Sequence, residues 1–156
     1  MKEKYNEILE RAKRYCRYQE RCKSELEKKL NKLEVPDKMK ELIIHELSEK
    51  EFFNNKRFSY EYAVGKFRNN NWGKIKIRYN LKLKSIEKNI IDEALKKIPI
   101  DEYLSAFNKI AQKLWIDRSK VDLISRKRGL TRTLQSKGWE FDLINKFLSE
   151  TRKNKI

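Results

Sequence analysis

The chain has 156 residues, which is room for one ordinary domain or a short array of small repeats. Charged residues make up 40% of it, hydrophobic residues 38%, and only four Gly and two Pro occur, which argues against an all-β fold rich in turns. The net charge of +16 favours an anionic partner, such as nucleic acid or a protein coated on it. The alternative is that the chain comes from a proteome in which all proteins are rich in lysine and are kept soluble by it.

The first fifty residues carry no signal for export, metal binding or catalysis. They lack the apolar core of a signal peptide, and no apolar run in the chain approaches the roughly 20 residues of a membrane span, so we expect a soluble, cytoplasmic protein. Cys16 and Cys22, the only cysteines, are expected to be reduced thiols. His45 is the only histidine, and no nucleophile arrangement surrounds it. We therefore expect no enzyme, no metal and no cofactor.

An internal repeat predicts the secondary structure. From Leu26, apolar residues follow at offsets of 4, 9, 13, 17 and 18, and the same offsets from Ile77 and Leu130 also fall on apolar residues throughout. Such spacing is typical of two amphipathic helices joined by a tight loop. An upstream apolar pair four residues apart adds a third helix to each repeat. In the last repeat this pair begins 19 residues before Leu130, whereas the other two pairs begin 14 residues before Leu26 and Ile77. About five extra residues therefore lie near Asp117–Val121.

We therefore predict an all-α fold of three tandem three-helix repeats, at residues 1–50, 51–100 and 101–156, forming an elongated and curved array. A compact bundle of the same helices is the alternative. Ser24-Glu25-Leu26-Glu27 has the pattern of a capping box before the middle helix of the first repeat. Asn55 can cap the helix that opens the second repeat.

Residues 75–83 carry a competing strand signal, because apolar and polar residues alternate there. The repeat offsets instead place Ile77 and Leu81, four apart, on the core-facing stripe of a helix and leave Ile75 and Tyr79 off it. A nine-residue strand would also find no partner strand elsewhere in the chain. We predict a helix here.

Two stretches without Asp or Glu carry the candidate binding residues. They are Tyr62–Ile86 and Leu123–Trp139, which include the middle helices of the second and third repeats. Their basic residues are Lys66, Arg68, Lys74, Lys76, Arg78, Lys82 and Lys84 in the first, and Arg126, Lys127, Arg128, Arg132 and Lys137 in the second. On adjacent repeats they would form a continuous basic surface for phosphates. Two solvated helix faces are the alternative.

Aromatic residues lie among these basic residues. Trp72 and Tyr79 fall off the core pattern and remain candidates for stacking on bases. Phe67, Trp115 and Trp139 occupy repeat positions, so we expect them in the core.

Several segments together resemble the RecX family, modulators of the RecA recombinase, over about residues 5–150. The segments are Arg14-Tyr15 with Glu20–Leu26, Lys56-Arg57-Phe58, Trp72-Gly73 with the Lys-Ile-Lys-Ile-Arg that follows, Leu81 with Ser85-Ile86, and Lys137-Gly138-Trp139 with Ile144. An acidic pair commonly precedes the Arg-Phe motif in the family, whereas Asn54-Asn55 stands there in this chain.

The resemblance implies three tandem three-helix repeats in an elongated, curved molecule without enzymatic activity. It implies binding along the groove of RecA nucleoprotein filaments, which limits filament growth, strand exchange, ATP hydrolysis and coprotease activity in DNA repair and recombination. We add Lys56 and Arg57 to the candidate contacts, and expect a monomer that avoids membranes, with single- or double-stranded DNA as a second partner. A helical-repeat protein that binds DNA or RNA directly is the main alternative, and a scaffold for acidic proteins is a third.

Overall fold

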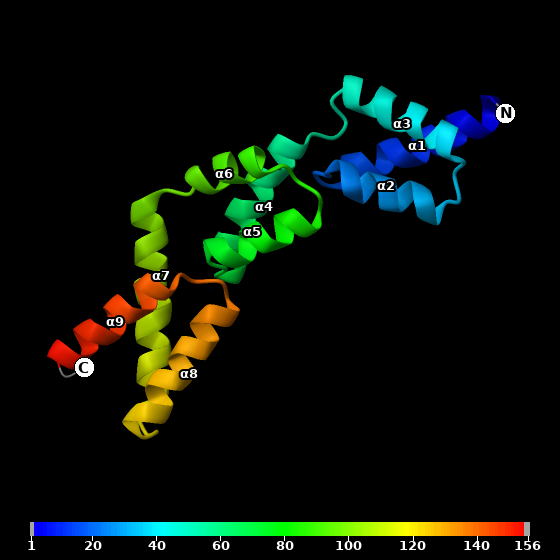
Figure 1. Ribbon diagram of the computed structural model, residues 1–156. Helices are drawn as coiled ribbons and strands as arrows, with labels where there is room; N and C mark the ends of the chain where they lie inside the picture. Colours follow the sequence, from blue (N-terminus) through cyan, green and yellow to red (C-terminus); the bar gives the residue numbers. More distant parts are fainter. Residues whose placement is uncertain (1, 155–156) are drawn as a thin grey trace. The chain divides into compact units, whose positions relative to one another are not determined.

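The computed structural model describes residues 2–154, which form nine α-helices and no strand (Figure 1). This confirms the all-α prediction. The helices are α1 (Lys2–Tyr18), α2 (Lys23–Lys32), α3 (Asp37–Glu49), α4 (Asn55–Asn70), α5 (Lys74–Leu83), α6 (Lys88–Lys96), α7 (Ile100–Asp117), α8 (Leu123–Ser136) and α9 (Phe141–Asn154). Within the described residues, none of these helices combines the length and apolarity that crossing a bilayer requires.

The repeat positions found in the sequence lie inside the protein. None of the eighteen is exposed, and eight are fully buried: Leu26, Leu30, Ile43, Ile77, Leu81, Leu130, Leu134 and Trp139. Ile75 and Tyr79, which the offsets leave off the stripe, are 54% and 61% exposed. The helical interpretation of residues 75–83 is therefore confirmed. The side chains that pack in the core follow a four-residue period, not the local alternation.

The chain divides into two compact units. The first consists of Met1–Glu61 and Leu81–Ala94, and the second of Tyr62–Asn80 and Leu95–Ile156. Helices α4, α5 and α6 each contribute residues to both units. The division into domains at residues 1–50, 51–100 and 101–156 stays a prediction.

Two of the predicted helix starts are wrong by a residue or two. The N-cap of α2 is Cys22 rather than Ser24, and Glu25 accepts a hydrogen bond from the Cys22 N–H at 3.4 Å. Asn54, not Asn55, caps α4, because its Oδ1 accepts from the backbone N–H of Arg57 at 2.9 Å. The amide oxygen of Asn55 accepts instead from the N–H of Lys23, also at 2.9 Å, and thereby supports the start of α2.

An aromatic cluster forms the core of the second compact unit. The Trp139 ring centroid lies 4.7 Å from that of Tyr103 and 5.5 Å from that of Phe107. Phe67 and Phe147 complete the cluster, with centroids 5.6 Å from Tyr103 and 6.4 Å from Phe107. Aromatic pairs in tilted or edge-to-face arrangement add to the burial of their area. The predictions that Phe67, Trp115 and Trp139 lie in the core are confirmed.

The end of α8 packs against the start of α5 within this second unit. The N–H of Gly73 donates to the carbonyl of Lys137 at 2.8 Å, and the N–H of Ile75 donates to that of Gly138 at 3.1 Å. The N–H of Lys74 donates to the Tyr103 hydroxyl at 2.9 Å. A helix leaves its first N–H groups without an internal partner, and here the end of α8 and one tyrosine supply those partners.

Tyr103 also makes a second contact, which adds to the effect of burial on its ionisation. Its hydroxyl donates a hydrogen bond to the carboxylate of Glu140. Burial, followed by this hydrogen bond, raises the pKa of Tyr103 above its ordinary value of 10.0. The Tyr103 hydroxyl is therefore neutral in the folded protein, where it accepts one hydrogen bond and donates another.

The free energy of unfolding of Tyr103→Phe should fall less steeply with rising alkaline pH than that of the wild type. A pKa raised in the folded state contributes stability that is fully present below the unfolded-state pKa, near 10.0, and is lost as the pH rises. The free energy of unfolding of the wild type should thus fall, relative to the variant, by up to about 1.4 kcal/mol per pH unit above this pKa. Urea unfolding at several alkaline pH values measures the difference. Parallel curves for the two proteins would contradict the buried, neutral hydroxyl.

Candidate nucleic-acid interface

A basic recess lies on one face of α8. Its lining residues, which come at four-residue steps in two adjacent rows, are Lys127, Thr131 and Gln135 in one row and Arg128 and Arg132 in the other. The recess is shallow, with a volume of about 420 Å³. No carboxylate lines it, and none of its three cations forms an ion pair with a described residue. Cations and amide or hydroxyl donors together suit an anionic ligand.

The opposite face of α8 holds this recess in place. Leu130 and Leu134 are fully buried. Asp122 caps the helix by accepting from the N–H of Ser125 at 3.0 Å, and this hydrogen bond holds the pKa of Asp122 below its ordinary value. An acid at the N-cap is favourable because of the helix dipole. The basic face is therefore carried by a helix fixed at its start and along its core side.

Arg126, also predicted to contact a partner, is used within the protein. Its guanidinium donates twice to the backbone carbonyl of Trp115, at 2.9 and 2.6 Å, and lies 3.7 Å from the centroid of the indole ring. These contacts join α8 to α7. The structure thus separates Arg126 from Arg128 and Arg132, which the sequence grouped with it.

Trp72, just before α5, lies close to two of the predicted lysines, one from α4 and one from α5. The ammonium of Lys76 lies 4.6 Å from the centroid of the Trp72 ring and that of Lys66 lies 5.0 Å from it. Trp72 is partly buried and meets Tyr62 edge to face at 6.4 Å. Cations over the indole compete with a base for that ring. Tyr79 remains the more accessible stacking candidate.

Three more of the predicted residues, Arg68, Lys74 and Arg78, lie in the second unit. Arg68 makes a bidentate ion pair with Glu102, at 2.9 and 3.0 Å, which lowers the pKa of that carboxyl. The ammonium of Lys74 lies 4.7 Å from the centroid of the Tyr103 ring. Arg78 is partly buried on α5. The pair formed by Arg68 is exposed at the surface and adds little stability.

The first unit holds four more of the predicted residues. Arg57 pairs with Glu20 at 2.6 Å and Glu51 at 3.6 Å, and Lys84 pairs with Glu25 at 3.0 Å. The other two, Lys56 and Lys82, are exposed. The charges of Arg57 and Lys84 are thus partly neutralised by the protein itself.

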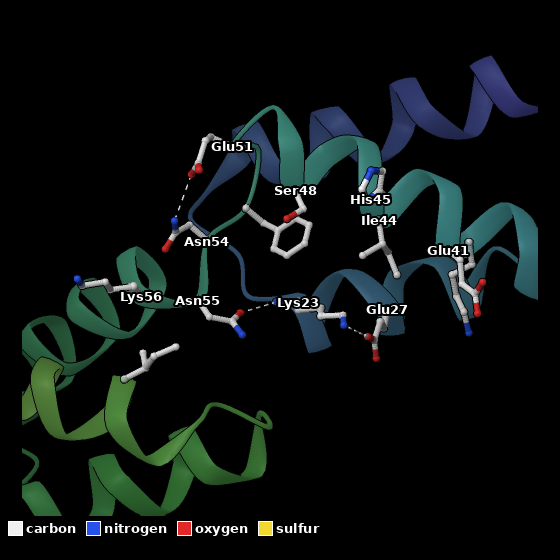
Figure 2. A pocket seen from close by; sticks show the side chains of 13 residues that line it. Lys23, Glu27, Glu41, Ile44, His45, Ser48, Glu51, Asn54, Asn55 and Lys56 are labelled. Atoms are coloured by element: carbon white, nitrogen blue, oxygen red, sulfur yellow. Dashed lines mark hydrogen bonds and ion pairs between the residues drawn. The ribbon is translucent and has the colours of Figure 1, made fainter.

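A larger recess, missed in the sequence, lies in the first unit and includes Lys56 (Figure 2). Its volume is about 780 Å³. The lining residues include three lysines and three glutamates, together with His45 and an apolar floor: Lys23, Lys40, Lys56, Glu27, Glu41, Glu51, Ile44, Phe53 and Ile90. Figure 2 shows Lys23 directed at Glu27, with 4.0 Å between the charged atoms. Such balanced charge does not suit a phosphate, so the α8 recess is the better candidate for one. Across residues 2–154, acidic, cysteine and histidine side chains nowhere gather in a metal-binding group of three.

Comparison with known proteins relates helices α4 to α6 to a described domain. Residues 54–95, which include α4, α5 and most of α6, match the family model "RecX, second three-helix domain". The chain is 30% identical to the protein named Regulatory protein RecX of Bacillus velezensis over 141 residues, which is 90% of this chain and 54% of the relative. The protein of the same name from Clostridium acetobutylicum is 31% identical over 134 residues, 83% of this chain and 62% of the relative. The chain thus spans about half to three fifths of these relatives.

Solved structures share the fold. The crystal structure of RecX from Lactobacillus salivarius superposes with a TM-score of 0.84 and 24% identity, over 96% of this chain and 97% of that one. A second crystal structure, of a regulatory protein RecX, has a TM-score of 0.82 and 23% identity, over 90% of this chain and 70% of that one. These likenesses concern the fold.

Proposed function

The chain belongs to the RecX family of regulatory proteins, and from this premise we propose that it binds RecA nucleoprotein filaments and limits their activity. The activities concerned are strand exchange, ATP hydrolysis and coprotease action in DNA repair and recombination. The observation that carries the proposal is the match to relatives named as regulatory proteins over 90% of this chain. The basic α8 recess supplies a means of binding, since a filament presents phosphates and acidic protein surface.

In the proposed mechanism the protein acts by binding alone, as a cytoplasmic monomer. Lys127, Arg128 and Arg132 meet phosphate or carboxylate oxygens in the filament groove, where charge-assisted hydrogen bonds are strong. Consecutive helical repeats then contact successive RecA subunits. A bridge of this kind favours one arrangement of neighbouring subunits and thereby opposes the changes that turnover and growth require.

The proposal is tested by titrating the protein into RecA assembled on single-stranded DNA. ATP hydrolysis and strand exchange should fall until the protein saturates the filament, and the protein should sediment with it. A basic protein of similar size and charge but unrelated fold serves as the control, and should leave both rates nearly unchanged at physiological salt. Unchanged ATP hydrolysis and strand exchange at saturation would overturn the proposal.

Direct binding of DNA or RNA is the second candidate, and the acid-free recess on α8 favours it. Three phosphate contacts would give a slope of log affinity against log salt of about −2 to −3. Binding of naked nucleic acid as tight as that of the filament would support this candidate. Weak binding to naked strands beside strong binding to the filament would reject it.

A further inference from the structure

Four aliphatic side chains stand exposed around the connection between α7 and α8. The exposed fractions are 64% for Ile116, 45% for Val121, 57% for Leu123 and 70% for Ile124. Figure 1 shows this connection at the lower end of the α7–α8 pair, away from the start of α9. We call these four residues the α7–α8 tip.

The tip is held firmly although it packs against little. The N–H of Ser119 donates to the carbonyl of Ile116 and that of Val121 to the carbonyl of Arg118, both at 3.1 Å. The guanidinium of Arg118 reaches α8 and donates to the Thr133 hydroxyl at 3.1 Å. The turn is therefore ordered. It contains Val121, and it joins the end of α7, which carries Ile116, to the start of α8, which carries Leu123 and Ile124.

The third repeat alone carries this turn. Its extra residues fall in 117–121, and α8 has 14 residues where the equivalent helices α2 and α5 have 10. The buried Trp115 lies just before the turn, so the core is closed without the tip. Single exposed apolar residues are ordinary, but four within nine residues around one connection point to an interaction site.

The chemistry of the tip and its surroundings selects a protein partner. Aliphatic side chains offer no ring on which a base can stack. Residues 116–128 carry five basic and two acidic residues, and Asp122 uses its carboxylate as the helix cap, so the complementary surface is acidic. A second copy of the chain, with its own charge of +16, is repelled. A membrane is disfavoured because the tip is a short turn without an aromatic anchor, not a long apolar helix face.

We propose that the α7–α8 tip docks into an acid-rimmed apolar recess on the protein component of the filament. The basic recess of α8 meets anionic oxygens beside it. This inference rests on the proposed function, because the filament is the partner assumed. It assigns the tip to protein recognition, so contact with naked DNA should not depend on it.

The test compares Leu123→Ser/Ile124→Ser with a control of matched exposure, Leu42→Ser/Ile100→Ser, whose native side chains are 60% and 58% exposed. Filament binding of the tip variant should weaken by roughly tenfold or more, because each buried aliphatic side chain contributes to affinity. Its affinity for naked single-stranded DNA and its thermal unfolding should match the wild type, and the control should bind filaments normally. Leu123→Ala/Ile124→Ala, which favours the helix, should show the same direction of change.

Three results would overturn the inference. The first is equal filament binding by the tip variant and a wild type that does bind filaments. The second is an equal loss by the control variant. The third is a loss confined to anionic vesicles or to self-association, which would assign the tip to lipid or to a second copy. A wild type that does not bind filaments at all would instead show that the proposed function has failed.

Discussion

Gly138→Ala is expected to lower the free energy of unfolding by about 3 kcal/mol, because the added methyl group meets both backbone strain and a steric clash. Gly138 has φ of 88°, a left-handed conformation that side chains rarely adopt. A Cβ there would overlap the backbone nitrogen and the Cβ of Lys76. Relief of the clash requires the end of α8 to move from the start of α5, which breaks the hydrogen bonds that join them. Urea unfolding measures the loss.

Gly65→Ala is the matched control for this substitution. Gly65 lies within α4, and the nearest atom to an added Cβ is the Asn69 Nδ2 at 4.0 Å. Alanine should therefore raise the free energy of unfolding by roughly 0.5–1 kcal/mol, through its higher helix propensity. Equal stability of the two variants would contradict the close packing of Gly138 on Lys76.

The sequence predicted the helices and the core because both depend on one period. The offsets repeated from Leu26, Ile77 and Leu130 select residues that are buried or partly buried in the structure. The same period decided between helix and strand at residues 75–83, where local alternation alone favours a strand. The buried positions recur at the same spacing in each repeat, so the sequence pattern alone is enough to identify them.

Helix starts were less predictable because two adjacent residues offered the same chemistry. Asn54 and Asn55 are both good caps. Asn55 does not cap α4, because its amide oxygen accepts a hydrogen bond from the N–H of Lys23 at the start of α2. Likewise Cys22 replaces Ser24 as the cap of α2, although cysteine is not a favoured capping residue.

The candidate site was predicted as a set of charges, but the sequence did not show which charges are already used. Arg57 pairs with Glu20, 37 residues away, and Lys84 pairs with Glu25, 59 residues away. An acid-free stretch excludes only acids that are near in sequence. The extra residues at 117–121 were found by counting, but their role in displaying an aliphatic tip required the exposure of each side chain.

Arg128→Glu/Arg132→Glu is expected to weaken filament binding by roughly a hundredfold or more, without loss of stability. Both side chains are exposed on α8, line the basic recess and make no ion pair with a described residue, so reversing their charges should change the stability little. A charge-assisted hydrogen bond contributes about 1.5–3 kcal/mol, and two lost bonds plus repulsion give an effect of this size. Sedimentation with RecA filaments measures it.

Lys109→Glu/Lys113→Glu is the control for overall charge. These lysines are also exposed, also four residues apart on one helix, α7, and reversal changes the net charge by the same amount. If α8 binds the filament, the control should weaken binding only slightly, through loss of long-range attraction that salt screens. Equal losses in the two variants would reject α8 as the contact and leave net charge as the cause.

The salt dependence of the α8 variant then separates the two anions that the recess can meet. Each lost phosphate contact lowers the slope of log affinity against log salt by about 0.7–0.9. A slope lower by about 1.5 would place Arg128 and Arg132 on DNA. A loss of affinity with an unchanged slope would place them on carboxylates of the filament protein, since pairing with a carboxylate releases no condensed counterions from DNA.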